Sequence, residues 1–331
     1  MKRKIKIVGI VLLCLFALVV LSLAVVKVSL DASYFKGYDP SAPLESSITD
    51  VQEKPTYTHM KVCFNGFRGD RVPTLLLAPK SAARPMPCVI FLHGIGQEKD
   101  FVEEQFDGKT VADPFLNAGY AFAAFDQFTR GERKKKRESS WGDLKDFRMR
   151  AAYTVNDTRR LIDYLDTRDD IAHDRIYLVG ASYGAITGST AAAFDKRIRA
   201  VVLTYGGGNM RAMLSSRATT EELRKKHIPV ALVQLFGWYF LSASDPLRYI
   251  DEIAPRPILL QNGTDDSLIA SAAAKALQDA APEPKTIKIY DGDHIGTDVK
   301  TVFVVLNDGL DFIKQQDAKI VSEESRTEPA S

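Results

Sequence analysis

The chain has 331 residues, of which 45% are apolar and 26% are charged, and these are the proportions of an ordinary globular protein. Its 44 basic and 42 acidic residues give a formal charge of +2, so the overall charge gives no reason to expect a nucleic-acid partner. Three cysteines are too few for a disulfide framework. The composition therefore excludes a largely disordered, a strongly basic or a disulfide-rich protein.

The N-terminal segment differs from the rest, because an uncharged apolar run extends from Ile7 to Val26. The run follows four basic residues: Lys2, Arg3, Lys4 and Lys6. Twenty helical residues are about 30 Å long, which matches the hydrocarbon core of a bilayer. We expect residues 1–27 to form a membrane anchor with its N-terminus in the cytoplasm and the rest of the chain on the extracytoplasmic side, periplasmic or extracellular in a bacterium. A cleaved signal peptide, with a small-residue site near Ser22 and Ala24, is the alternative and would make the protein secreted.

Residues 28–55 are polar, show little periodicity and are expected to form a stalk or linker. From Thr56 onward, short apolar strands alternate with helical segments, and we assign residues 56–313 to one domain. The expected strands are 58–65, 72–79, 87–92, 120–126, 175–179, 200–204, 257–261 and 285–290. Helices are expected at 151–165 and 185–194. This order predicts an α/β fold, with a mostly parallel eight-stranded sheet covered by helices on both faces.

Two further segments complete the expected organisation. Residues 209–250 interrupt the alternation and are longer than an ordinary connection, so we expect a short helical cap over the end of the sheet. Residues 314–331 are polar and are expected to be a disordered tail. Cys63 and Cys88 lie in strands that another strand would separate, which favours free thiols over a bridge between them.

The segment from Gly180 to Gly184 reads GASYG and lies between a predicted strand and a predicted helix. A GxSxG pattern arises by chance in roughly one chain of this length in ten, so the pattern alone is weak. Its position in a strand-to-helix turn predicts an exposed, strained nucleophile at Ser182. A serine hydroxyl attacks poorly unless a base removes its proton.

His294 is the expected base, because it lies in a loop directly after the last strong strand. The other four histidines have simpler explanations in strands, polar loops or the cap: His59, His93, His173 and His227. Asp266, in the loop after strand 257–261, is the expected carboxylate that orients the base. Its neighbour Asp265 stays as the alternative, with helix capping or a solvated position as the other reading.

The order serine, aspartate, histidine along the chain is that of the α/β-hydrolase arrangement. Two backbone N–H groups are expected to bind the oxyanion: that of Tyr183, directly after the nucleophile, and that of Ile95 in FLHGIGQ. Ile95 lies between two glycines, which leave room for a carbonyl oxygen.

Six segments of the chain resemble the α/β-hydrolase superfamily, within it the dienelactone hydrolase, acetyl xylan esterase and prolyl-oligopeptidase-like branch. They are FLHGIG, DQFTRGER, VNDTRRLIDYL, DRIYLVGASYG, DPLRYIDEIAPRPILLQNGTDD and GDHIG. The resemblance covers residues 56 to 313 and implies a serine hydrolase that needs no metal or cofactor and acts through an acyl-enzyme. The chain lacks a propeller-sized partner domain, which weakens the expectation of oligopeptide cleavage.

We therefore expect a membrane-anchored serine hydrolase, a carboxylesterase that cleaves small or medium acyl esters. An acyltransferase or a prolyl-oligopeptidase-like peptidase would use the same three residues, and a catalytically silent tethered binding module is the alternative outside the enzymes. The expected partners are a small-molecule ester and the membrane, and no nucleic acid. The sequence does not define an oligomeric state.

Two segments have alternative interpretations. The basic run 130–137 lies on the expected rim of the site, where it would attract anionic substrates or lipid headgroups, or it is a solvated loop. The aromatic stretch 235–240 lines an acyl pocket or forms the core of the cap.

Overall fold

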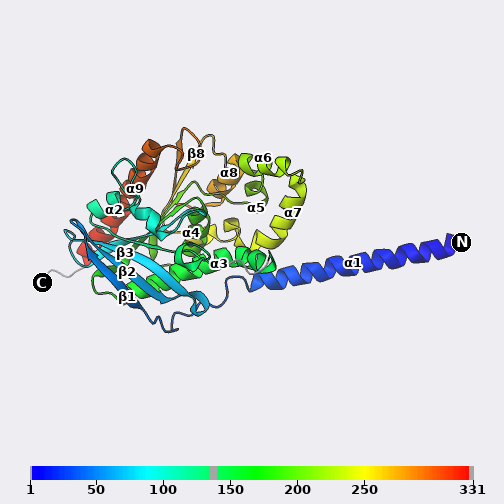
Figure 1. Ribbon diagram of the computed structural model, residues 1–331, viewed down its shortest axis with the longest axis horizontal. Coiled ribbons are helices and arrows are strands. Elements are labelled where there is room, and N and C mark those ends of the chain that lie inside the picture. The colour runs from blue at the N-terminus through cyan, green and yellow to red at the C-terminus, as the bar shows by residue number, and fades with distance from the viewer. Residues whose placement is uncertain (1, 135–139, 328–331) are drawn as a thin grey trace.

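The computed structural model describes residues 2–134 and 140–327. A long helix, α1 (Lys2–Ala32), projects from an α/β domain (Figure 1). Within the described residues, α1 is the one helix that is long and apolar enough to cross a membrane. In its segment Lys6–Ala32, the most apolar window has a mean hydropathy of 3.1 and none of that window is buried. The prediction of an apolar N-terminal helix is confirmed, and by length and composition this helix fits a membrane span or a signal sequence.

One sheet of nine strands forms the centre of the domain, in the order β1-β2-β3-β5-β4-β6-β7-β8-β9. The strands are β1 (Ser47–Glu53), β2 (Tyr57–Asn65), β3 (Arg71–Pro79), β4 (Met86–Leu92), β5 (Ala121–Phe125), β6 (Ile171–Ala181), β7 (Ile198–Thr204), β8 (Ile258–Gly263) and β9 (Lys285–Tyr290). The six strands from β5 to β9 in this order pair in parallel, and β1, β2 and β3 extend the sheet in antiparallel pairs. The α/β class and the mostly parallel sheet are confirmed.

The sheet has one strand more than the eight predicted. β1 pairs with β2 in antiparallel fashion, within the segment expected to be a stalk. Nearly all of its side chains are exposed. Apolar patterns report which side chains are buried, whereas β1 is held by backbone hydrogen bonds at the edge of the sheet, so its sequence carries no such pattern.

Helices cover both faces of the sheet. Side chains of α3, α4 and α8 contribute to the core on one face, and those of α2 and α9 contribute to the core on the other face. The helices outside the cap are α2 (Asp113–Asn117), α3 (Ser140–Leu165), α4 (Tyr183–Phe194), α8 (Ser271–Ala280) and α9 (Val299–Thr327). Short 3₁₀ turns occur at Phe67–Gly69, Lys99–Glu103, Gly131–Arg133, Ser242–Ser244, Pro246–Arg248 and Ile250–Ile253.

β4 shows how the sequence produces the two cores. Every one of its residues is buried, and successive side chains point to opposite faces. Cys88 and Ile90 belong to the core under α3 and α4, while Val89 and Phe91 belong to the core under α9. A strand buried on both sides therefore reads as one continuous apolar run.

The C-terminal segment is helical to Thr327, so the prediction of a disordered tail is wrong for residues 314–327. Asp317 is buried and accepts hydrogen bonds from the hydroxyls of Tyr120 and Tyr177, and it forms an ion pair with Arg175. The polar residues that suggested a tail therefore include a buried carboxylate, which anchors α9 to the sheet. Residues 328–331 of the predicted tail lie outside the described residues.

The predicted cap, 209–250, is helical. It contains α5 (Met210–Met213), α6 (Arg217–Lys225) and α7 (Val230–Leu241), followed by three of the short turns. In Figure 1, α6 and α7 form the end of the domain from which α1 projects. The cap therefore lies between the sheet and the N-terminal helix.

Candidate active site

Ser182 lies in the sharp turn between β6 and α4. Its φ of 55° and ψ of −115° are a strained conformation for a residue with a side chain. A side chain at Gly180 would collide with the backbone of Gly184, and one at Gly184 would collide with the backbone of Leu92. The two glycines of the motif are therefore required by the close approach of β6, α4 and the end of β4.

The structure brings Ser182, His294 and Asp266 together at the carboxyl ends of the parallel strands. His294 Nε2 lies 2.9 Å from Ser182 Oγ, and His294 Nδ1 lies 2.8 Å from Asp266 Oδ2. The side chains of His294 and Asp266 are 7% and 5% exposed, so water competes little with these contacts. A carboxylate only accepts hydrogen bonds, so Nδ1 carries the proton and Nε2 is left to accept the serine hydroxyl.

The alternative carboxylate, Asp265, does not contact the histidine. Asp265 is exposed, and its backbone N–H donates to the carbonyl of Gly292. Asp266 turns inward, and its second oxygen accepts hydrogen bonds from the backbone N–H groups of Leu268 and Ile269. These hydrogen bonds orient the carboxylate toward His294.

Two further residues position the histidine, and the sequence analysis missed both. Asp293 accepts hydrogen bonds from the backbone N–H groups of Ser267 and His294, which ties the histidine loop to the Asp266 loop. These bonds hold the pKa of Asp293 below its usual value. The ring of Tyr205 lies edge-on to the imidazole, with 5.5 Å between the ring centroids, and burial beside Asp266 raises the pKa of Tyr205 to about 12. The only sequence signal for Asp293 is its position directly before His294.

The two predicted oxyanion donors lie in two neighbouring loops beside Ser182. Tyr183 is the first residue of α4, where backbone N–H groups have no partner within the helix. Ile95 lies in the loop after β4, and a Cβ added to its neighbour Gly94 would be 3.7 Å from the Cβ of Ser182. Gln127 donates to the carbonyl of His93, and Gln97 accepts from the N–H of Gly94, so side chains fix this loop on both sides.

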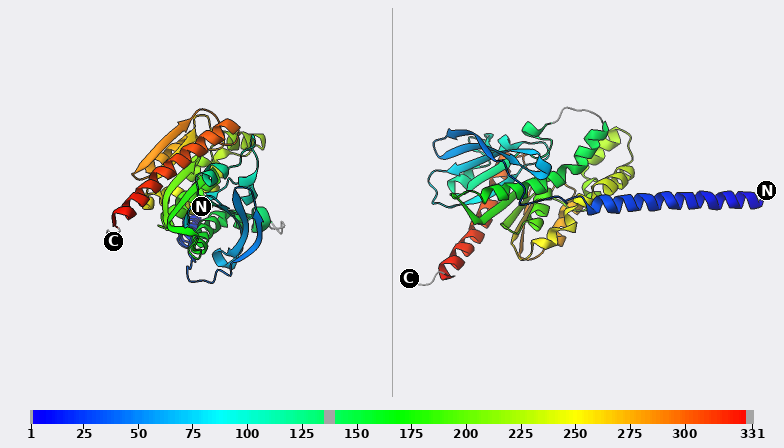
Figure 2. Two further views of the ribbon diagram at one scale, coloured as in Figure 1. Left: turned by 90° about the vertical axis from the view of Figure 1, so that its left-hand side faces the viewer. Right: turned by 90° about the horizontal axis from the view of Figure 1, so that it is seen from below.

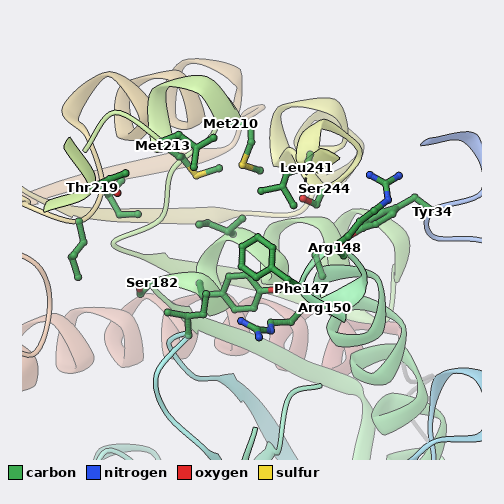
Figure 3. Close-up of a pocket in the computed structure, with 17 residues that line it drawn as sticks. Tyr34, Phe147, Arg148, Arg150, Ser182, Met210, Met213, Thr219, Leu241 and Ser244 are labelled. Atoms are coloured by element: carbon green, nitrogen blue, oxygen red, sulfur yellow. Dashed lines mark hydrogen bonds between the residues drawn. The ribbon is translucent and has the colours of Figure 1, made fainter. Parts of the chain in front are cut away.

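Two apolar cavities open on Ser182. The first, of about 330 Å³, has walls from the cap and from α3, and we call it the cap cavity (Figure 3). The second, of about 410 Å³, has walls from α9 and from the loops after β4, and we call it the α9 cavity. Ser182, Ile95 and Leu268 line both cavities, whereas His294 lines only the α9 cavity. The serine therefore lies at a junction with apolar space on two sides.

The basic run 130–137 is partly structural. Arg133 is buried and pairs with Asp157 at 2.7 Å, so it is not part of a solvated loop. Burial raises the pKa of Asp157 despite the arginine beside it. Lys134 is exposed and pairs with Glu98, in keeping with a solvated residue. Residues 135–137 of the run lie outside the described residues.

The aromatic stretch 235–240 follows neither interpretation. Leu235 and Phe236 are 53% and 59% exposed, so they do not form the core of the cap. The residues of 235–240 are also absent from the walls of the cap cavity, and the next residue, Leu241, lines it. Cys63 and Cys88 are free thiols, as predicted.

Among the residues described, no group of three or more His, Cys, Asp or Glu side chains is arranged to hold a metal ion. Of the other histidines, His93 is fully buried and its Nδ1 lies 2.9 Å from the carbonyl oxygen of Gly94. Burial lowers the pKa of His93. His93 is therefore a neutral part of the loop that carries Ile95.

Known proteins match both the sequence and the fold. The family model described as the alpha/beta hydrolase fold matches residues 87–227. A Bacillus subtilis protein named "Putative hydrolase YtaP" is 28% identical over 218 residues, which are 60% of this chain and 67% of the relative. The structure of an acetyl xylan esterase from Paenibacillus sp. R4 is 18% identical, with a TM-score of 0.69, over 86% of this chain and 93% of that protein. Acetyl xylan esterase 1 from Thermoanaerobacterium is 17% identical, with a TM-score of 0.65, over 84% of this chain and 93% of that protein.

The strand order, the nucleophile turn and these matches define one class of fold, the α/β-hydrolase fold. The matches confirm the resemblance to the α/β hydrolases that the sequence motifs predicted, and the protein is an enzyme with this fold.

Proposed function

We propose that the protein is a serine esterase in which Ser182 is the nucleophile, His294 the general base and acid, and Asp266 the residue that orients the histidine. The observation that carries the proposal is the continuous chain of contacts from Ser182 Oγ through His294 to Asp266, with distances of 2.9 and 2.8 Å. Both are hydrogen-bond distances, so the proton of Ser182 can pass to His294 while Asp266 holds the ring in place.

Acylation follows from this geometry. Ser182 Oγ attacks the carbonyl carbon of the ester while its proton moves to His294 Nε2. The carbonyl oxygen becomes an oxyanion, which the backbone N–H groups of Tyr183 and Ile95 stabilise. The bond to the leaving alcohol then breaks, and the alcohol takes the proton from His294. Asp266 stabilises the imidazolium between these two transfers.

Deacylation repeats the sequence with water. Water gives its proton to His294 Nε2 as it attacks the acyl carbon, and the second oxyanion forms in the same place. When it collapses, the proton returns to Ser182 Oγ and the carboxylic acid leaves. The enzyme ends in its starting state, so no cofactor or metal is needed.

The two cavities bind different parts of the ester substrate. The leaving oxygen must lie beside His294, because it takes its proton from Nε2. His294 lines the α9 cavity and not the cap cavity, so we assign the leaving alcohol to the α9 cavity and the acyl group to the cap cavity. Both solved structures compared above are named acetyl xylan esterases, which supports an ester over an amide as the substrate.

We also propose that α1 anchors the enzyme and that the α/β domain lies on the extracytoplasmic side. The basic residues before the apolar run favour a cytoplasmic N-terminus. Mass spectrometry of the mature protein should therefore recover residues 1–27 on the chain. A mature N-terminus just after Ala24 would show that a signal peptide is removed and would contradict the anchor.

The test of the reaction is Ser182→Ala. Its kcat on 4-nitrophenyl acetate should fall by a factor on the order of a million, with the folded structure intact, and a fluorophosphonate probe should no longer label the protein. Ser189→Ala on the same helix is the control, and it should keep both activity and labelling. Retention of most of the activity in Ser182→Ala would overturn the proposal, as would an absence of labelling in the native protein.

A further inference from the structure

Within the part of the chain that the structure describes, the outer face of the apolar helix α7 packs against no other element. Its sequence, VALVQLFGWYFL, contains one polar side chain between Val230 and Trp238, and it has no buried residue. Leu232, Leu235 and Phe236 are between 49% and 59% exposed. A contiguous exposed apolar face of this kind marks a surface that contacts another apolar phase.

Direct contacts join α7 to the end of the apolar run of α1. The hydroxyl of Tyr239 donates to the carbonyl of Leu23 at 2.8 Å, and Lys27 Nζ lies 5.0 Å from the centre of the Trp238 ring. Leu23 lies in the last turn of the run and Lys27 directly follows it. If α1 spans a bilayer, α7 therefore lies at the depth where the hydrocarbon ends and the headgroups begin.

The composition around α7 suits that depth. Tryptophan and tyrosine are enriched at membrane interfaces because their rings are apolar and their polar atoms remain hydrated. Residues 209–241 of the cap also contain five basic and two acidic residues, a net charge of +3 that favours contact with the phosphate groups of lipids. Figures 1 and 2 both show α7 on the side of the domain from which α1 projects.

The cap cavity extends from the catalytic serine toward this same side. Tyr34, two residues beyond the end of α1, lines the cavity together with Phe147 and Leu241 at the end of α7. Phe147 is 45% exposed, so an apolar side chain of the wall also reaches the surface. In Figure 3, Ser182 and Tyr34 lie at opposite sides of the cavity. An acyl chain in this cavity would therefore point from the serine toward the membrane.

We propose that the outer face of α7 lies in the headgroup region of the bilayer that α1 spans, and that the substrate is an amphiphilic long-chain ester taken from that bilayer, with its acyl chain in the cap cavity. The part of this inference that concerns the substrate rests on the proposed esterase function. The position of α7 does not depend on it. A second copy of the chain or another membrane helix could cover the outer face of α7 in place of lipid. Quenching by brominated lipid and crosslinking between chains distinguish these cases.

The first experiment measures where α7 lies. Trp141→Phe leaves Trp238 as the only tryptophan, and the full chain is placed in nanodiscs of phosphatidylcholine and phosphatidylglycerol that hold one chain each. Phosphatidylcholine brominated near the headgroup should quench Trp238 by at least half, and phosphatidylcholine brominated at the end of the acyl chain should quench it less. The same result is expected with Ser182→Ala, because quenching needs no catalysis. A Trp238 that no brominated lipid quenches overturns the proposal, and so does crosslinking of two chains through α7 in vesicles.

The second experiment measures the effect on the substrate. The double variant Leu235→Glu, Phe236→Glu is compared with the native chain in the same lipids, using 4-methylumbelliferyl oleate dissolved in the membrane and 4-nitrophenyl acetate in water. Neither residue lines a cavity at Ser182. The value of kcat/KM for the oleate should fall at least tenfold, and the value for the acetate should stay within twofold.

The matched control is the double variant Ile287→Glu, Ile289→Glu, which charges two exposed isoleucines on the edge strand β9. It should leave both substrates unchanged. Unchanged oleate hydrolysis in the α7 variant overturns the membrane substrate. If the native chain hydrolyses neither ester while Trp238 is still quenched, the esterase proposal fails and the membrane position of α7 stands.

Discussion

The carboxyl edge of the sheet and the cap meet at Ser182, and their side chains differ in kind. At the edge, His294, Asp266 and Asp293 are polar side chains that are joined to each other or to the backbone by hydrogen bonds. In the cap, α7 exposes leucine and phenylalanine, and the cavity under the cap is apolar. Under the proposed function, the edge carries out the reaction and the cap selects and orients the substrate.

The largest expected effect is at the edge. Asp266→Asn should lower kcat by about 10⁴, because an amide neither fixes the tautomer of His294 nor stabilises its imidazolium form. Steady-state kinetics on 4-nitrophenyl acetate would measure this. Asp265→Asn is the control and should stay within about twofold, because Asp265 is exposed and does not contact His294. Equal losses in both variants would contradict the assignment of Asp266.

The next largest effect is on the free energy of unfolding and concerns the buried ion pair between Arg133 and Asp157. Arg133→Met should lower the free energy of unfolding by about 3 to 5 kcal/mol, because it leaves the buried carboxylate of Asp157 without its partner. Urea denaturation followed by circular dichroism is the measurement. Lys134→Met, next in sequence, removes an exposed pair with Glu98 and should change the stability by less than about 1 kcal/mol. If both variants lowered the free energy of unfolding by a similar amount, the buried ion pair of Arg133 would contribute no more than the exposed pair of Lys134.

A smaller effect is expected from the cap. Met213→Trp narrows the cap cavity and should lower kcat/KM for octanoate relative to acetate esters by about 10-fold, a size typical of a pocket that excludes a few methylene groups. A series of 4-nitrophenyl esters of increasing acyl length gives the comparison. Val302→Trp fills the α9 cavity instead and should discriminate between alcohols while the acyl preference is kept. If Met213→Trp changed the alcohol preference and Val302→Trp the acyl preference, the acyl group would bind in the α9 cavity and the alcohol in the cap cavity.

The smallest effect concerns pH. Burial lowers the pKa of His93 below its ordinary value of 6.5, so the unfolded chain binds this proton more readily than the folded protein does. The free energy of unfolding should therefore fall as the pH decreases from 6.5, and His93→Asn should reduce this dependence. His227→Asn, an exposed histidine of the cap, should leave it unchanged. A native protein whose stability does not change between pH 7 and pH 5 would contradict the prediction.

The sequence predicted the edge better than the cap. The three residues at 182, 266 and 294 each follow a predicted strand, and the carboxyl ends of parallel strands meet at one edge, so their proximity follows from the chain order. The choice between Asp265 and Asp266 depended on one residue of register, and the structure brings Asp266 to the histidine. The role of Asp293 was not predictable, because its partner Ser267 lies in a different loop.

The elements that the sequence analysis missed lack a local signal. β1 has exposed side chains and is recognised only by its pairing with β2. The second half of α9 is polar in sequence, and its buried Asp317 was therefore not recognised as an anchor. The partners of Asp317 are hydroxyl and guanidinium groups from β6 and from Tyr120, which lie far away in the sequence. α7 shows the converse limit, because its apolar residues suggested a pocket wall or the core of the cap, whereas Leu235 and Phe236 are exposed.

The position of α9 in the chain has a consequence for how the protein is made. Leu306, Leu310 and Ile313 of α9 lie in one apolar core with Tyr177 of β6, Val202 of β7 and Leu259 of β8. These α9 residues are synthesised after all nine strands. The part of this face that α9 covers therefore stays exposed until α9 has been made, and during this interval its apolar side chains are open to aggregation.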